Sequence, residues 1–112
     1  MTREFIRTSY FDKRWTEMGL NDNDLRELEI YLLDNVGIGN VIPGTGGAIK
    51  VRWALSGNDK GKSGGTRIIY IDLIRKAHIH LLLCYPKSKQ ETLTNEQKKH
   101  IKQLIKTLKG ED

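Results

Sequence analysis

The chain has 112 residues, of which 38% are hydrophobic and 29% charged. This length and composition predict one domain, residues 1–112, with a core that needs no disulfide or structural metal. Its single cysteine excludes an intrachain disulfide, and the absence of a signal-peptide pattern or a run of roughly 20 apolar residues predicts a cytoplasmic protein with no membrane partner. The net charge of +5 is unevenly distributed: residues 1–49 carry five basic and eight acidic side chains, and residues 50–112 carry fourteen and six. This asymmetry favours a polyanion as partner, nucleic acid first and an acidic protein second.

The N-terminal part predicts a strand followed by a helical hairpin. Residues 4–8 read as a short strand, and Ser9 is a suitable cap for a helix with apolar residues at helical spacing, namely Phe11, Trp15 and Met18. A second helix is expected from Asn21 or Asp22, with one apolar face formed by Leu25, Leu28, Leu32 and Val36. The glycine-rich residues 37–47 then predict an exposed connection; they lack the Lys-Ser/Thr ending and the preceding strand of a phosphate-binding P-loop.

The C-terminal part predicts three strands and a final helix. From Ala48 the apolar period becomes two, so Lys50 and Arg52 are expected on the same side of a half-buried strand. Residues 56–65 read as a hairpin connection, and residues 66–73 and 78–85 as central strands. Residues 94–97 form a capping-box pattern that begins a helix with apolar and lysine-rich faces. The expected fold is α+β, a small antiparallel sheet with helices packed on it, in the order βααβββα.

Several residues with possible chemistry have simpler structural interpretations. His78 and His80 are two apart on a predicted strand and in principle share a zinc ion or act as an acid and base, but only Cys84 and Asp72 lie nearby as further ligands. Cys84 lies in an apolar run, as expected of a buried, inert thiol. His100 lies among lysines on a helix surface. We therefore expect no metal site, and no cofactor motif is present.

The strongest signal is a set of cations near the predicted strands. Its members are Lys50 and Arg52 on one strand, Lys60 and Lys62 in the connection, Arg67 on the next strand, and Lys87 and Lys89 after the last strand. Like charges on neighbouring antiparallel strands destabilise the sheet unless an anion lies between them. RNA offers such an anion, together with its own nucleophile, the 2′-hydroxyl. Cleavage then requires a base, cations for the transition state and an acid for the leaving oxygen; a lysine base must be neutral, and neighbouring cations favour that form.

Four segments carry a family resemblance that spans nearly the whole chain in one order: residues 43–47 (PGTGG), 49–52 (IKVR), 61–70 (GKSGGTRIIY), and 85–87 (YPK) followed by Leu93-Thr94 and a lysine-rich helix. With these segments the chain resembles the RelE superfamily of bacterial type II toxin-antitoxin toxins, most closely its HigB-like branch. The resemblance implies a small α+β endoribonuclease that cleaves mRNA, in many members on the ribosome, through a 2′,3′-cyclic phosphate without a metal. It also implies a cognate antitoxin, expected to be a helix-turn-helix protein.

The resemblance also implies roles for individual residues. The family pattern Lys-x-Lys-x-Arg aligns with residues 48–52, so Lys50 is the expected general base, while Ala48 replaces the first lysine and Lys60 or Lys62 is expected to compensate. Arg67 is the expected transition-state clamp and Lys87 the expected acid or phosphate contact. RNA-binding roles fall to Arg52, Lys60, Lys62, Tyr85 and Lys89.

Two other functions remain open from the sequence. The first is that of the ParE-type relatives, which have the same fold and inhibit DNA gyrase by binding it; the presence of Lys50, Arg52 and Arg67 argues against this. The second is a noncatalytic basic module that binds RNA or ribosomes. Steep dependence of binding on salt without a cleavage product is the property that distinguishes it.

Overall fold

The computed structural model describes residues 3–54 and 65–110, and these form an α+β domain with five strands, three α-helices and one 3-10 helix. In chain order the elements are β1 (Glu4–Arg7), α1 (Ser9–Glu17), α2 (Asp22–Asp34), β2 (Asn40–Val41), β3 (Ile49–Trp53), β4 (Thr66–Leu73), the 3-10 helix η1 (Ile74–Lys76), β5 (His78–Pro86) and α3 (Asn95–Leu108). Among the helices described, none combines the length and apolar character that crossing a membrane requires. The predicted α+β class is confirmed, but the predicted order βααβββα is wrong because it omits β2.

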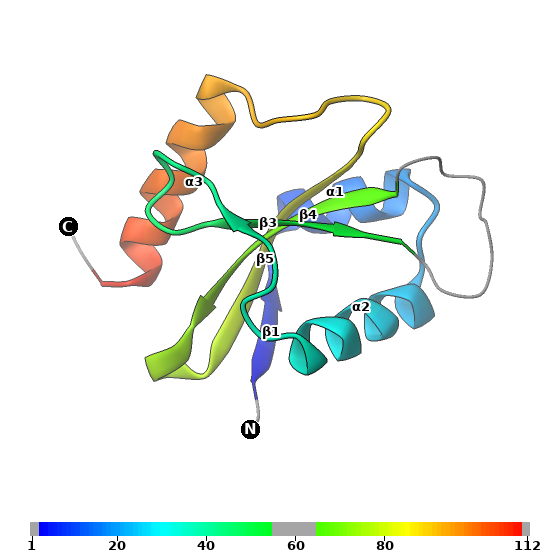
Figure 1. The fold of residues 1–112 in the computed structure, drawn as a ribbon, viewed down its shortest axis with the longest axis horizontal. Helices are drawn as coiled ribbons and strands as arrows, with labels where there is room; N and C mark the ends of the chain where they lie inside the picture. Colours follow the sequence, from blue (N-terminus) through cyan, green and yellow to red (C-terminus); the bar gives the residue numbers. More distant parts are fainter. Residues whose placement is uncertain (1–2, 55–64, 111–112) are drawn as a thin grey trace.

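The sheet is mixed, which corrects the prediction of an antiparallel sheet. Its strand order is β1-β5-β4-β3-β2, and β1 pairs in parallel with β5 while the other neighbours are antiparallel (Figure 1). A parallel pair needs a long connection between its strands, and here most of the chain lies between β1 and β5. The pairing of the first strand with the last depends on contacts distant in sequence, which local periodicity does not record.

Strand β2 lies within the segment that was predicted to be only a connection. Asn40 pairs with Lys50, and Val41 pairs with Ile49. The turn that follows is held by Thr45, whose hydroxyl donates to the Ile42 carbonyl (2.7 Å) and accepts from the Ala48 amide (3.0 Å). These side-chain bonds fold the glycine-rich segment back on β3, so it extends the sheet by one short edge strand.

The helices begin at side-chain caps, with one shift from the prediction. The cap of α1 is Thr8, not Ser9: the Thr8 hydroxyl accepts a hydrogen bond from the Phe11 amide at 2.9 Å. Asn21 caps α2, and Thr94 caps α3 through the predicted capping box. Val36, expected on the apolar face of α2, lies beyond the end of that helix and is 49% exposed.

Helices cover both faces of the sheet, so there are two hydrophobic clusters. Helices α1 and α2 pack against one face through residues that include Phe11, Trp15 and Leu28, and α3 packs against the other through Ile101 and Ile105 (Figure 1). Val51 and Trp53 of β3 belong to the first cluster. Since side chains alternate along a strand, Lys50 and Arg52 belong to the face that carries α3.

Candidate functional site

The predicted cations of β3 and β4 meet at one end of the sheet. Arg52 lies directly opposite Arg67 in the β3–β4 pairing, and Arg67 lies directly opposite Tyr85 in the β4–β5 pairing. Side chains opposite one another on adjacent strands are neighbours on the same face. The three side chains thus form a row across the sheet. Lys50 lies two residues before Arg52 on the same strand.

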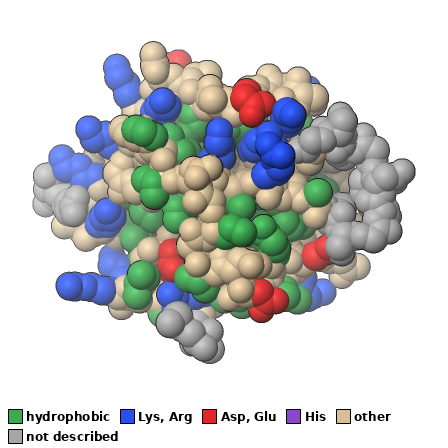
Figure 2. Space-filling view, viewed as in Figure 1, with side chains coloured by type: hydrophobic (Ala, Val, Ile, Leu, Met, Phe, Trp, Pro, Cys, Tyr) green, Lys and Arg blue, Asp and Glu red, His purple; other side chains and the backbone are tan. Residues whose placement is uncertain are grey.

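Glu91, in the segment between β5 and α3, connects side chains from three strands. Its carboxylate oxygen Oε2 lies 3.4 Å from a terminal nitrogen of Arg67. Its backbone carbonyl accepts hydrogen bonds from Lys50 Nζ at 3.3 Å and from the Tyr85 hydroxyl at 3.5 Å. We refer to Lys50, Arg52, Arg67, Tyr85 and Glu91 as the Arg67 site. On the face of the molecule drawn in Figure 2, Lys and Arg side chains lie beside an acidic side chain, and other Lys and Arg side chains lie along the side where α3 lies.

Burial differs sharply within the Arg67 site. The Arg67 side chain is only 3% exposed, whereas the Glu91 side chain that contacts it is 60% exposed. Arg52 is exposed and Lys50 is half-buried. Burial raises the pKa of the Tyr85 phenol, an effect that Arg67 partly offsets and Glu91 reinforces. Tyr85 is therefore a neutral hydrogen-bond donor at physiological pH.

The other predicted cations are placed only in part. Lys87 and Lys89 are exposed on the segment after β5. The Lys87 amide donates to the Gly65 carbonyl at 3.3 Å, which holds its backbone beside the start of β4, two residues from Arg67. Lys60 and Lys62 lie outside the described residues.

The positively charged side chains of the Arg67 site are suited to binding an anion. Arg67 is a planar, permanently charged donor fixed by burial, and Lys50 and Arg52 add two positive charges from the neighbouring strand. Positively charged donors held in place before a ligand arrives stabilise negative charge that develops during a reaction. The arrangement can hold a phosphate and place a lysine amine and a tyrosine hydroxyl near it.

His78 and His80 lie toward the opposite end of β5 from the Arg67 site. His78 begins that strand and Tyr85 stands seven residues later, so they are separated by roughly 23 Å along it. The rings of His78 and His80 lie edge to face with centroids 5.8 Å apart, and His78 Nε2 is 3.6 Å from a carboxylate oxygen of Glu4. Among the described residues, no three His, Cys, Asp or Glu side chains are grouped as metal ligands.

Two other candidates from the sequence have structural roles. Burial raises the pKa of the Cys84 thiol to about 12, so this cysteine is not a nucleophile at neutral pH. Asp72 forms an ion pair with Arg3, with Oδ1 2.8 Å from Nε and Oδ2 3.3 Å from a terminal nitrogen. The carboxylate therefore ties the N-terminal residues to β4.

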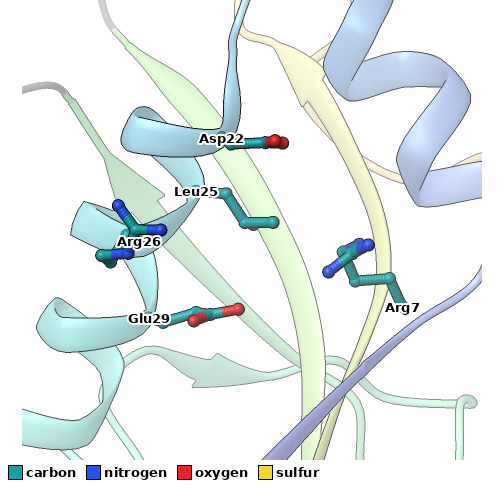
Figure 3. Close-up of a pocket in the computed structure, with 5 residues that line it drawn as sticks. All are labelled: Arg7, Asp22, Leu25, Arg26 and Glu29. Carbon is teal, nitrogen blue, oxygen red and sulfur yellow. The ribbon is translucent and has the colours of Figure 1, made fainter.

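A cavity of about 270 Å³ lies on the other face of the sheet, between β1 and α2. Figure 3 shows Arg7 from β1 facing residues of α2, and the lining consists of Arg7, Asp22, Leu25, Arg26 and Glu29. Burial raises the pKa of Glu29, and the positive charges of Arg7 and Arg26 partly offset this increase. Two positive and two negative side chains balance one another here, in contrast to the excess of cations at the Arg67 site.

Sequence reasoning missed Glu91, whose side chain completes the Arg67 site. The residue lies in a polar stretch between the predicted strand and the capping box, and nothing in its spacing relates it to Lys50 or Arg67. The sequence signal was weak: Glu91 is the first acidic residue after a strand end that carries two lysines.

No protein-family model matches this chain. The assignment of an activity therefore depends on the Arg67 site and on the resemblance carried by the sequence motifs.

Proposed function

We propose that the protein is an endoribonuclease that cleaves mRNA at the Arg67 site, as the toxin of a type II toxin-antitoxin system. The observation that carries the proposal is the convergence of Lys50, Arg67 and Tyr85 on Glu91, with Arg52 directly opposite Arg67. Three cations from two adjacent strands gather where the Glu91 carboxylate supplies opposing charge. An RNA backbone supplies further negative charge and contains the nucleophile.

In the proposed reaction, the base is the fraction of Lys50 that has lost its proton: its neutral amine accepts the proton of the 2′-hydroxyl, and O2′ attacks the adjacent phosphorus. Arg67 and Arg52 stabilise the charge that accumulates on the phosphoryl oxygens, as fixed donors do in other phosphoryl reactions. Lys87 donates a proton to the leaving O5′ as the P–O5′ bond breaks. The products are a 2′,3′-cyclic phosphate and a 5′-hydroxyl end, and protons balance because one is taken up by Lys50 and one released by Lys87.

Further parts of the proposal concern substrate and partners. The exposed Lys89 contacts RNA beside the scissile phosphate. The RNA contact expected of Tyr85 is replaced by a supporting role, because this side chain is 1% exposed and its hydroxyl donates to the Glu91 carbonyl. The substrate is mRNA on the translating ribosome in the cytoplasm, and a helix-turn-helix antitoxin restrains the toxin. The lysine-rich surface of α3, whose exposed residues include Lys102 and Lys106, is a suitable surface for an acidic segment of that antitoxin.

The deciding experiment maps transcript ends in cells that express the protein without an antitoxin. We expect Arg67→Ala and Lys50→Ala to reduce cleavage by about 100-fold or more, the usual effect of losing a fixed charge-stabilising or proton-transfer group. Arg75→Ala and Lys106→Ala are matched controls because they remove the same charges at exposed positions on η1 and α3. Both controls should retain cleavage within about twofold.

Three results contradict the proposal in different ways. Unchanged cleavage in Arg67→Ala and Lys50→Ala places the active site elsewhere. Intact mRNA together with inhibited DNA supercoiling identifies a gyrase inhibitor. Salt-dependent RNA binding without new transcript ends identifies a noncatalytic RNA-binding module.

A further inference from the structure

The Arg67 site already holds an anion, the carboxylate of Glu91. This carboxylate contacts a guanidinium that is 3% exposed, so a second anion cannot approach Arg67 in the same way while Glu91 stays in place. Two negative groups at that position also repel each other. Binding of a phosphate to Arg67 therefore requires the Glu91 side chain to leave.

The contact between Glu91 and Arg67 has the properties of a displaceable pair. Its N–O distance of 3.4 Å is longer than the ~2.7–2.9 Å of a strong bond between an arginine and a carboxylate. The contact joins a terminal nitrogen of Arg67 to the carboxylate oxygen Oε2, at the long end of the hydrogen-bonding range. The carboxylate is 60% exposed, so it regains water readily when it turns away.

The backbone of Glu91 keeps this carboxylate close to Arg67. Glu91 is covalently part of the segment between β5 and α3, and Lys50 and Tyr85 donate to its carbonyl at 3.3 and 3.5 Å, contacts that do not involve its side chain. The residue therefore stays near Arg67 when its carboxylate turns away. A group tethered in this way competes at an effective concentration that a dissolved anion reaches only in the millimolar range or above. A nucleic-acid backbone, which carries several phosphates, overcomes this competition because it contacts other cations of the site at the same time.

We propose that the Glu91 carboxylate is an internal competitor for the anion-binding position of Arg67 and so limits the affinity of the site for phosphate. The inference rests on the proposed function in so far as the anion is an RNA phosphate. Glu91 then determines the affinity of the site because its carboxylate must move away when substrate binds. The cations of the site act differently, since they hold the bound substrate.

The test compares Glu91→Gln with Glu96→Gln by titration at constant ionic strength. Glu96 is exposed in the first turn of α3, so its substitution removes the same charge without touching the Arg67 contact. Two probes are used: inorganic phosphate, and a 2′-deoxy oligonucleotide that cannot be cleaved because it lacks the nucleophile. We expect Glu91→Gln to bind both probes about two- to fivefold more tightly, the range for release of one exposed ion pair. Glu96→Gln should change neither affinity by more than about 1.5-fold.

A third variant, Glu91→Asp, separates contact from charge. It keeps the negative charge but shortens the side chain by one methylene, so the 3.4 Å contact with Arg67 is lost. If competition depends on that contact, Glu91→Asp binds both probes nearly as tightly as Glu91→Gln. The inference is overturned if Glu91→Asp behaves as the wild type, if Glu91→Gln and Glu96→Gln tighten binding equally, or if Glu91→Gln weakens binding.

These outcomes are independent of RNA cleavage. A wild-type protein that binds the deoxy oligonucleotide but leaves RNA intact contradicts the proposed ribonuclease while the comparison of Glu91 and Glu96 variants still decides the inference. Conversely, RNA cleavage with unchanged affinities in Glu91→Gln supports the ribonuclease and rejects the internal competitor.

Discussion

Strand β4 carries two arginine–carboxylate pairs, one near each end, and they differ in nearly every physical property. Near its end, Asp72 binds Arg3 through two contacts of 2.8 and 3.3 Å, and both side chains are buried, at 7% and 4% exposure. Near its start, Arg67 contacts Glu91 at 3.4 Å, and only the arginine of this pair is buried. The first pair is short and shielded from water, whereas the second is long and open to it on the carboxylate side.

The difference separates a structural ion pair from one available for exchange. A buried pair with two-point geometry loses much when either partner is removed, because the other charge stays desolvated. An exposed carboxylate gains little from its arginine, since water replaces the contact at small cost. The Arg3–Asp72 pair therefore fixes the N-terminal residues on the sheet, while the Arg67–Glu91 pair leaves its arginine able to take another anion.

The largest expected effect comes from changing the two arginines to lysine. We expect Arg67→Lys to lower RNA cleavage by about 100-fold, because lysine keeps the charge but loses the planar fork that contacts two phosphate oxygens. Arg3→Lys should leave the cleavage rate of the folded protein within about twofold of wild type. Single-turnover cleavage of a defined RNA measures both, with circular dichroism as a check of folding. Equal losses in the two variants contradict the functional difference between the pairs.

The next largest effect is on stability, at the Arg3–Asp72 pair. Asp72→Asn leaves the buried arginine without this counter-charge, so we expect the Tm to fall by about 5 °C or more. Thermal unfolding followed by circular dichroism provides the measurement. The matched control is Asp34→Asn, which removes a carboxylate at the exposed end of α2 and should shift Tm by less than about 2 °C.

Local patterns predicted most of the elements of this fold. Apolar spacing placed both N-terminal helices, and the Thr94–Gln97 capping box marked the start of α3 correctly. The errors concern pairings between distant segments. The parallel pairing of β1 with β5 and the addition of β2 to β3 depend on how the chain folds back, and no periodicity within either segment encodes them.

The candidate site was predictable where it depends on strand geometry. Alternation placed Lys50 and Arg52 on one face, and the antiparallel pairing of β3 with β4 brought Arg52 opposite Arg67. Glu91 was not predictable, because it reaches the site from irregular backbone whose path is set by hydrogen bonds from Lys50 and Tyr85. The burial of Arg67 was also not predictable from the sequence. It depends on packing in three dimensions, and a charged residue on a strand is usually exposed.

A smaller effect, in the dependence of stability on pH, is expected at the end of the sheet that carries Asp72. Burial lowers the pKa of His80, and the charges of His78 and Lys76 lower it further. The folded state then binds fewer protons than the unfolded state, so stability is full above the ordinary histidine pKa of about 6.5 and falls as the pH drops below it. Denaturant unfolding at pH 7.5 and at pH 5.5 measures this loss.

The control for the pH effect is the exposed His100 on α3. We expect His80→Gln to reduce the loss of stability between the two pH values, since no imidazole is then left at this position to resist protonation. His100→Gln should keep the wild-type dependence because this residue is exposed on the helix surface. The same dependence in the wild type and in His80→Gln rules out this buried imidazole as its source.

The smallest expected effect concerns the stability of the Arg67–Glu91 pair, and it tests whether that pair is open to exchange. We expect Glu91→Gln to change the free energy of unfolding by less than about 0.5 kcal/mol, because the lost carboxylate is exposed and the amide oxygen that replaces it still offers Arg67 an acceptor. Chemical denaturation at neutral pH, side by side with Asp72→Asn, provides the measurement. A loss as large as that of Asp72→Asn makes the Glu91 contact structural, and the two ends of β4 then hold the same kind of ion pair. A near-neutral result leaves Arg67 with a counter-ion that the fold does not need, which is the condition for its replacement by a phosphate.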